Sequence, residues 1–339
     1  MKAVSFTKNG NVEVLQYSEL QTPEPKKGEA LIRVRACALN NLDVQQRQGK
    51  IQGPMPHISG SDVAGIIEKI NGESTFKEGD EVVINPAIPC GICPPCKMNL
   101  TCELVIIFGY KTQGGYAEYV TVPIEQCYLK PKNLSFAEAA AFPLTFLTAY
   151  HMLVTRANLQ KGETLFIWGA SGGLGLAALQ IGKYLGANII AATKSEENIK
   201  YLKEHGADEV VIYTKDNAED KVKKLTHDRG VDVVFESVGA KTWNTSLMML
   251  HPYGRVVIAG TTSGDMGTQD LSEIYYRQLN ILGARMGTKA EFQKIVKLIA
   301  ESKLKPVIDK IFPLQNAAEA QKRMEEGKHK GKIILEIPE

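Results

Sequence analysis

The segment Trp168-Gly-Ala-Ser-Gly-Gly-Leu-Gly175 is the strongest indication of fold class in this 339-residue chain. It follows the apolar run TLFIWG and opens the helical run LGLAALQIGKYLG, so its glycines lie at a strand-to-helix turn. Gly172 lets the backbone approach a phosphate, and Gly175 lets the helix pack closely on the strand. Free N–H groups and a positive dipole end make such a helix start attractive to anions. We therefore predict a dinucleotide-binding loop, in a variant form with Ala170 where the strict pattern has glycine.

Downstream of this loop, apolar runs alternate with helical runs. NIIAAT, EVVIY, DVVFESV, RVVIAG and LNILGA are typical of strands, and EENIKYLKEHG, KVKKLTHD and WNTSLMML are typical of helices. Buried strands that alternate with amphipathic helices form a parallel, doubly wound sheet. We expect a Rossmann-type domain over residues 146–284. The alternative is a tight turn in an α/β domain that binds no ligand.

The second strand of this domain indicates which dinucleotide binds. NAD enzymes usually end this strand with an acidic residue that binds the ribose, whereas this strand ends Ala192-Thr193-Lys194-Ser195. Lys194 suits a 2′-phosphate, and Thr193 and Ser195 can donate hydrogen bonds to it. This favours NADP(H), with NAD as the alternative, since Ser195 could instead cap the next helix and the acids at 196–197 would repel a phosphate.

The first part of the chain is β-rich. Strands are predicted at 30–37, 62–70, 81–85 and 116–122, with Gly and Pro clusters between them. Residues 137–154 have helical spacing, and after Arg285 the pattern changes to helices and a final strand, KIILEI. We expect this tail to return to the first domain.

Four of the six cysteines crowd into one turn-rich segment, as Cys90, Cys93, Cys96 and Cys102. Four thiolates on a short loop can surround one tetrahedral zinc ion, and such a closed site is structural rather than catalytic. A metal-free or disulfide-bonded loop is the alternative. Glu103 stands where an iron–sulfur run has proline.

Composition excludes several function classes. There are 40 basic and 38 acidic residues, a net charge of +2, and 44% hydrophobic residues. A near-neutral charge argues against a nucleic-acid or membrane surface as partner. We find neither a signal peptide nor a long uncharged apolar run, and expect a cytoplasmic protein.

Together these features resemble the medium-chain dehydrogenase/reductases over essentially the whole chain. The similar stretches include MKAVSF, PHISGSDVAGII, GDEVVINP, GGYAEYVTVP and GKIIL, while PLTFLTAY and GASGGLG are most similar to the quinone oxidoreductase branch. The resemblance implies a chaperonin-10-like (GroES-like) substrate domain over 1–145 and 285–339, with its zinc lobe at 90–102 and one structural zinc per chain. The last cysteine gap is two residues shorter than is usual in the family. A homodimer or homotetramer is also implied.

The resemblance also implies roles for single residues. The pyrophosphate loop would comprise Ala170, Ser171, Gly172, Gly173, Leu174 and Gly175. Lys183 and Tyr213 would join Lys194 and Ser195 at the adenosine phosphate, with a solvated lysine and a strand-end aromatic as the alternatives. Thr148 and Leu174 would border the nicotinamide, or simply pack.

The ligands of a catalytic zinc are absent at the matching positions. Zinc-dependent members of the family have Cys, His and a further Cys or acid there; this chain has Asn40, Ser61 and Leu144. These side chains are poor zinc ligands, and the nearby His57, Asp43 and Asp62 match no zinc pattern.

Without a Lewis acid, a conjugated carbonyl is an easier hydride acceptor than a simple one. We expect NADPH-dependent reduction of a small quinone or α,β-unsaturated carbonyl, with Asn40 as hydrogen-bond donor and Asp43 orienting Asn40 or the ribose. Solvent would supply the proton. One alternative is an NAD(P)-dependent alcohol or aldehyde dehydrogenase with an unorthodox second zinc. Another is a non-enzymatic NADPH-binding protein of the crystallin kind.

Overall fold

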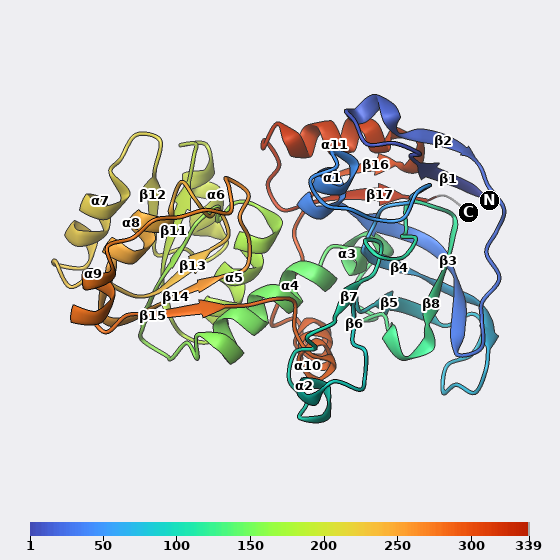
Figure 1. The fold of residues 1–339 in the computed structure, drawn as a ribbon, viewed down its shortest axis with the longest axis horizontal. Helices are drawn as coiled ribbons and strands as arrows, with labels where there is room; N and C mark the ends of the chain where they lie inside the picture. Colours follow the sequence, from blue (N-terminus) through green and yellow to red (C-terminus); the bar gives the residue numbers. More distant parts are fainter. Residues whose placement is uncertain (338–339) are drawn as a thin grey trace. The chain divides into compact units, whose positions relative to one another are not determined.

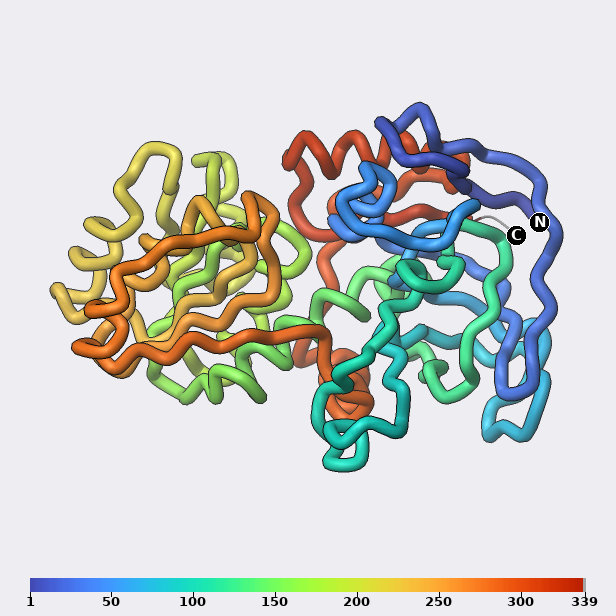
Figure 2. The backbone as a smooth tube through the Cα atoms, viewed as in Figure 1, coloured from blue at the N-terminus to red at the C-terminus, as the bar shows by residue number. Residues whose placement is uncertain are grey.

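The computed structural model describes residues 1–337 and divides the chain into two compact units. Unit 1 comprises Met1–Leu144 and Thr288–Glu339, and unit 2 comprises Thr145–Gly287. The C-terminal segment therefore rejoins the unit that contains the N-terminus, as the red and blue traces show (Figure 2). No helix within residues 1–337 is long and apolar enough to cross a membrane.

Unit 2 is built on a six-stranded sheet in the order β12-β11-β10-β13-β14-β15. All neighbouring strands are parallel, and this order is that of the Rossmann fold (Figure 1). The strands are β10 (Thr164–Ile167), β11 (Asn188–Thr193), β12 (Glu209–Ile212), β13 (Val231–Glu236), β14 (Leu250–Ile258) and β15 (Asn280–Gly283). The doubly wound parallel sheet predicted from the alternating pattern is confirmed.

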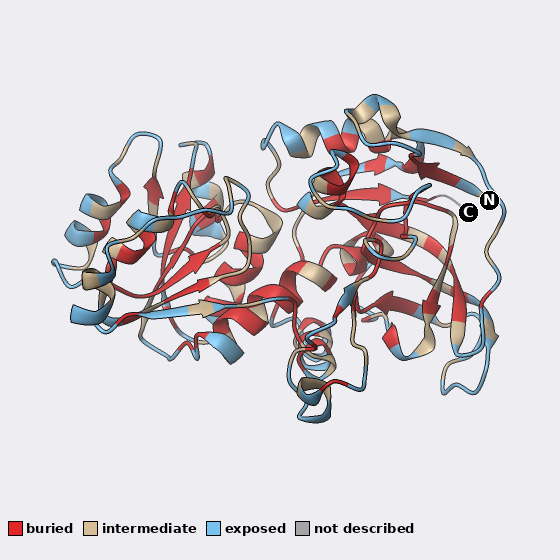
Figure 3. Ribbon diagram, viewed as in Figure 1, coloured by how far each residue is buried: buried red, intermediate tan, exposed pale blue. Residues whose placement is uncertain are grey.

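Helices cover both faces of this sheet. A Cβ on Gly182 of α5 (Gly173–Tyr184) would contact Leu165 and Ile189, so α5 packs on that face. Successive side chains of a strand point to opposite faces, so Phe166, the neighbour of Leu165, faces the other side of the sheet. There it shares a core with α7 (Ala218–Leu225) and α8 (Trp243–Met248). The central strands are buried on both sides as a result (Figure 3). The other helices are α6 (Asn198–Glu204) and α9 (Leu271–Tyr276).

Unit 1 contains a seven-stranded sheet in the order β16-β17-β3-β4-β5-β9, with β8 also paired to β3. Its strands are β3 (Glu29–Ala38), β4 (Asp62–Asn71), β5 (Glu81–Ile84), β8 (Tyr119–Pro123), β9 (Cys127–Leu129), β16 (Ile308–Pro313) and β17 (Lys332–Glu336). β17 pairs antiparallel with β3. This register places the C-terminal strand beside residues 36–38 and, as shown below, positions a polar cluster.

Smaller elements complete unit 1. The pairs β1 (Lys2–Ser5) with β2 (Gln16–Glu19) and β6 (Ala87–Ile88) with β7 (Ile106–Ile107) are antiparallel. The helices are α1 (Asn41–Arg47), α2 (Pro94–Lys97), α3 (Phe136–Ala140), α10 (Lys289–Ala300) and α11 (Ala317–Glu325).

The helical segment predicted at 137–154 is not one helix. α3 ends at Ala140, α4 runs over Pro143–Tyr150, and a π-helical turn follows over His151–Arg156. Pro143 explains the break, because proline lacks an N–H and disfavours the α conformation of the residue before it. The strand predicted at 116–122 begins only at Tyr119; Tyr116 bonds instead to Ser59 and Val4.

Candidate functional site

A buried polar cluster lies where β3 runs into α1. Asn40 lies two residues beyond the end of β3 and is the N-cap of α1, and its backbone N–H donates to Asp43 Oδ2 at 2.8 Å. Asp43 also accepts from Gly60 N (3.2 Å) and Tyr116 Oη (3.2 Å). Burial raises the pKa of Asp43 to about 6. The structure thus brings Asn40 and Asp43 together, with Asp43 bonded to the backbone rather than the side chain of Asn40.

The Asn40 side chain is bonded to Asp62 and Lys332. Its Nδ2 donates to Asp62 Oδ2 at 2.9 Å, and its Oδ1 accepts from Lys332 Nζ at 2.7 Å. Lys332 Nζ also donates to Asp62 Oδ2 at 2.9 Å. Asn40, Asp62 and Lys332 are 6%, 0% and 3% exposed. A buried ion pair is tolerated only when hydrogen bonds satisfy it, as they do here.

Strand register explains this meeting. Ile334 pairs with Ala38 in the antiparallel β17–β3 ladder, and Leu39 N donates to the oxygen of Ile333. Two residues further along, Lys332 therefore comes opposite Asn40. Ala38 also pairs with Asp62 at the start of β4.

The His57 and carboxylate side chains near this cluster do not converge on one point. Within residues 1–337, Cys90, Cys93, Cys96 and Cys102 are the one group of three or more potential ligands that does. His57 Nε2 donates to Gly109 O at 3.1 Å, and burial lowers the pKa of His57 to about 4. Asp62 Oδ1 accepts the Leu144 N–H at 2.8 Å, so both Asp62 oxygens are engaged. Ser61 is buried, and its hydroxyl has no hydrogen-bond partner in the described part of the chain.

The glycine loop of unit 2 joins β10 to α5. Gly172 is the N-cap of α5 and supplies no side-chain cap, so the first N–H groups of the helix stay free. A Cβ on Gly172 would meet nothing closer than Gly169 O at 3.6 Å, which leaves open space above the backbone. A Cβ on Gly175 would lie 2.4 Å from the same oxygen. A phosphate fits this arrangement, because free donors face unfilled space.

Side chains at the end of β11 adjoin the loop. Asn198 Nδ2 donates to Thr193 Oγ1 at 2.8 Å and to Ser171 Oγ at 3.4 Å, which ties the strand end to the loop. Thr193 is only 2% exposed, so it anchors the loop internally. Ser195 Oγ accepts the Glu197 N–H at 3.4 Å, and Lys194 is exposed.

The remaining predicted residues separate into two groups. Tyr213 N donates to Thr193 O at 3.1 Å, and its ring packs on Trp168, so Tyr213 lies at the loop edge of the sheet. Lys183 lies in the last turn of α5, the end away from the loop, and forms a 2.7 Å ion pair with Asp208. The structure therefore does not bring Lys183 to the loop. Lys215 instead forms an ion pair at 2.9 Å with Glu196, which lies just beyond the end of β11.

Two positions expected near the nicotinamide lie in unit 2. Leu174 is half-buried in the first turn of α5. Thr148 on α4 is buried, and its hydroxyl donates to Met286 Sδ at 3.9 Å.

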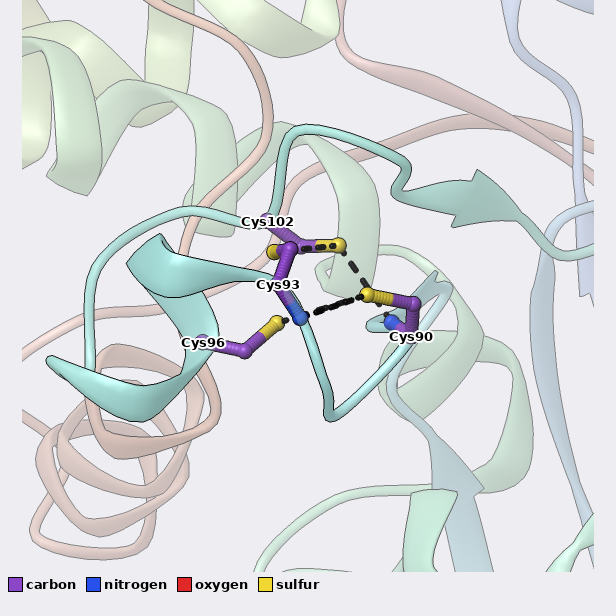
Figure 4. A group of neighbouring side chains, drawn as sticks. All are labelled: Cys90, Cys93, Cys96 and Cys102. Atoms are coloured by element: carbon purple, nitrogen blue, oxygen red, sulfur yellow. Dashed lines mark hydrogen bonds between the residues drawn. The ribbon is translucent and has the colours of Figure 1, made fainter.

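The four clustered cysteines lie on the loop around α2 and point toward one another (Figure 4). Their sulfur atoms all lie within 4.8 Å of one another, with Cys90–Cys96 at 4.0 Å and Cys93–Cys102 at 3.8 Å. A tetrahedral zinc with Zn–S bonds of about 2.3 Å needs sulfur separations of about 3.8 Å. Backbone N–H groups from Ile92 and Cys93 lower the pKa of Cys90 to about 6. The shorter last gap is thus compatible with a zinc site.

Sequence reasoning missed Asn198 and the role of Lys332. Asn198 had a local signal, since it lies five residues after Thr193, in the first turn of the next helix. Lys332 had only a weak one, a lone lysine at the start of the apolar strand KIILE. Its partner Asn40 is 292 residues away, so only the sheet reveals the contact.

Two family models match the chain. One, described as "Alcohol dehydrogenase GroES-like domain", matches residues 26–132, and the other, "Zinc-binding dehydrogenase", matches residues 173–301. The first falls in unit 1, and the second begins within the glycine loop, covers the rest of unit 2 and extends into α10 of unit 1.

Individual proteins match over the full length. Quinone oxidoreductase of Homo sapiens is 32% identical over 99% of this chain and 97% of its own. NAD-dependent alcohol dehydrogenase of Sulfolobus acidocaldarius is 32% identical over 99% of this chain and 100% of its own. A crystal structure described as an NAD-dependent alcohol dehydrogenase is 40% identical, with a TM-score of 0.96 over 100% of both chains.

Proposed function

The chain belongs to the medium-chain dehydrogenase/reductase family and is an oxidoreductase, and from this premise we propose that it uses NADPH to reduce quinones or α,β-unsaturated carbonyls without a catalytic metal. The observation that carries the proposal is the Asn40 cluster. At Asn40, one of the three positions that match the catalytic-zinc ligands of zinc-dependent members, a side-chain amide is held between an ammonium and a carboxylate. Such a cluster offers hydrogen-bond donors in place of metal ligands.

Asn40 would act on the oxygen of the acceptor. When bound, reduced nicotinamide supplies a hydride, and an acceptor activated by its own double bonds takes it at carbon. Negative charge then develops on the carbonyl or quinone oxygen, where the Asn40 N–H would stabilise it. The buried surroundings strengthen this hydrogen bond, because little water competes for it.

The proton would come from solvent. His57 is buried, donates its Nε2–H to a backbone carbonyl, and has a pKa of about 4, so it is neutral at physiological pH and poorly suited to proton delivery. Burial and the negative charge of Asp43 raise the pKa of Tyr116 far above its usual value, which makes its hydroxyl a poor acid. The Ser61 hydroxyl is a further donor of the same region.

NADP(H) is the proposed cofactor, held by the loop Ala170–Gly175 and the end of β11. No carboxylate follows Thr193 directly, and Lys194 is exposed there. Glu196, which would repel a 2′-phosphate, is paired with Lys215 at 2.9 Å. The relatives described as NAD-dependent make NAD the alternative.

One structural zinc per chain is proposed for the cysteine cluster. The sulfur separations match a tetrahedral ion, and four thiolates leave no open position for a substrate. The ion would hold together the loop of residues 90–102.

The second candidate function is that of an NAD-dependent alcohol dehydrogenase. The observation in its favour is the similarity to proteins of that description, at 32% and 40% identity. It requires a metal or another strong electrophile near Asn40.

Assembly into a homodimer or homotetramer is also proposed. β15 is an edge strand whose residues are mostly exposed, and Tyr275 and Tyr276, at the end of the preceding helix α9, are 62% and 76% exposed. Edge strands and exposed aromatic residues favour pairing with a second copy. Light scattering of the purified protein tests this, and a monomer at micromolar concentration contradicts it.

A substrate panel combined with metal analysis tests the function. The purified enzyme is assayed with NADPH and NADH against a quinone, an enone, a saturated aldehyde and a primary alcohol, before and after treatment with a chelator. We expect one zinc per chain, NADPH oxidation with the quinone or enone, and little loss of activity after chelation below the unfolding temperature. Two metal ions per chain and activity confined to the alcohol and aldehyde support the second candidate instead.

A further inference from the structure

The hydrogen-bond partners of Asn40 permit one orientation of its side-chain amide. A lysine ammonium has three donors and no acceptor, and an ionised carboxylate only accepts. Lys332 Nζ lies 2.7 Å from Asn40 Oδ1, and Asp62 Oδ2 lies 2.9 Å from Asn40 Nδ2. Turning the amide over would place donor against donor and acceptor against acceptor at these distances. Both charge-assisted hydrogen bonds would be lost.

The other contacts of the cluster prevent a rearrangement that would avoid this conflict. Asp62 is held on its far side by the Leu144 N–H at 2.8 Å, and it is fully buried. Lys332 donates to both Asn40 Oδ1 and Asp62 Oδ2, so moving its ammonium out of the cluster would break two charge-assisted hydrogen bonds. The Asn40 backbone is fixed separately, by its bond to Asp43.

One donor of Asn40 remains. An amide nitrogen carries two hydrogens, and within residues 1–337 only the bond to Asp62 occupies one of them. The Asn40 oxygen is already taken by Lys332, which also polarises the amide and strengthens its N–H as a donor.

We propose that Lys332 and Asp62 are positioning residues that lock the Asn40 amide so that it presents an N–H, and never its oxygen, to the substrate. This inference rests on the proposed function. It specifies that the acceptor must place a hydrogen-bond-accepting oxygen at Asn40, as a quinone, an enone or the enolate formed from it does.

A double-mutant cycle tests the proposal. Steady-state kcat and KM are measured with NADPH and 1,4-naphthoquinone or cyclohex-2-enone for the wild type, Asn40→Ala, Lys332→Met and the double variant. Losing a preorganised donor typically costs about 10²–10³-fold in kcat, so we expect a loss of about this size in Asn40→Ala. We expect a smaller loss, about 10- to 100-fold, in Lys332→Met, which keeps the amide but not its fixed orientation. Because Lys332 acts through Asn40, the double variant should be no slower than Asn40→Ala. Multiplying effects would overturn the proposal.

Two controls separate positioning from other roles. The Kd of NADPH, measured by its fluorescence, should change less than threefold in Lys332→Met; a loss of affinity as large as the loss of kcat would make Lys332 a cofactor ligand and overturn the proposal. Lys332→Met leaves Asp62 without its counter-ion, so Lys332→Met/Asp62→Asn provides a variant with no unpaired charge. The Lys332→Met/Asp62→Asn variant should unfold at a temperature near that of the wild type. It should still have a low kcat, because the Asn40 amide can then adopt either of its two flipped orientations. Wild-type kcat in a folded pair would refute the locking argument.

A readout without turnover distinguishes failure of this inference from failure of the proposed function. In protein labelled with 15N-asparagine, Asn40→Ala identifies the side-chain amide signals of Asn40. We expect these signals to move in Lys332→Met and in the pair, because the bond to Oδ1 is lost. Unchanged signals would overturn the inference even in an active enzyme. A wild type that reduces neither quinones nor enones, but whose signals move as expected, would refute the proposed function alone.

Discussion

Alanine at Gly172 should weaken dinucleotide binding, whereas alanine at Gly175 should destabilise the fold of the loop. At Gly175 the new methyl group would lie 2.4 Å from Gly169 O and 2.6 Å from Ala170 Cα. These are backbone atoms, which cannot rotate away. At Gly172 the nearest atom is 3.6 Å distant, and φ −78° with ψ 169° is a conformation that alanine adopts freely. The two variants therefore separate the role of packing from that of ligand approach.

The magnitudes follow from these contacts. Overpacking costs about 1–3 kcal/mol, and the better helix propensity of alanine offsets up to about 1 kcal/mol. Gly175→Ala should therefore be about 1–2 kcal/mol less stable than the wild type. Gly172→Ala should change stability by roughly 0.5 kcal/mol or less. Its methyl group would fill the space that a phosphate needs, and loss of one charge-assisted hydrogen bond, about 1.5–3 kcal/mol, raises the Kd by about 10- to 100-fold.

Two measurements check this pair. Urea unfolding gives the stability of each variant, and NADPH fluorescence titration gives the Kd. We expect Gly175→Ala to lose stability and Gly172→Ala to lose affinity at nearly unchanged stability. Wild-type affinity in Gly172→Ala would refute the assignment of the phosphate to this loop, and wild-type stability in Gly175→Ala would refute the packing argument.

Three further predictions concern the cofactor, the zinc and pH. Lys194→Ala should raise the KM for NADPH about 10-fold and leave the KM for NADH unchanged, as expected for the loss of one charged hydrogen bond. Lys183→Ala is the matched control, since Lys183 pairs with Asp208. An equal effect of both variants would contradict the assignment of Lys194 to the 2′-phosphate. Cys102→Ser should lose the zinc measured by atomic absorption and lower the unfolding temperature, whereas Cys127→Ser, a buried cysteine outside the cluster, should retain one zinc per chain; zinc retained in both would exclude the cluster. Burial raises the pKa of Asp43 from 3.8 to about 6, so the native state binds this proton more tightly than the unfolded state does. The contribution of Asp43 to the free energy of unfolding therefore falls as pH rises from about 4 to 6, by on the order of 3 kcal/mol. The stability of the wild type relative to Asp43→Asn should therefore decrease over this range in urea unfolding, and an increase would show that the carboxylate is the favoured form.

Local sequence patterns were sufficient for the fold. The glycine loop with its flanking strand and helix, and the alternation that follows it, predict a parallel sheet because these signals depend on neighbouring residues and on burial of whole strands. The cysteine cluster was visible for the same reason, since its four members lie within thirteen residues of sequence, 90–102. The helical spacing of residues 137–154 did not show that the segment breaks before Pro143 into separate helices.

Which side chains meet depends on the three-dimensional arrangement of the elements. Lys183 and Lys194 are both lysines near the loop in sequence, yet the helix carries Lys183 to its far end, toward Asp208, while Lys194 stays at the strand end. Lys332 reaches Asn40 only because the β17–β3 register places residues 292 positions apart side by side. Periodicity encodes which face of an element is buried, but contacts between distant elements depend on strand order and register, which no local pattern specifies.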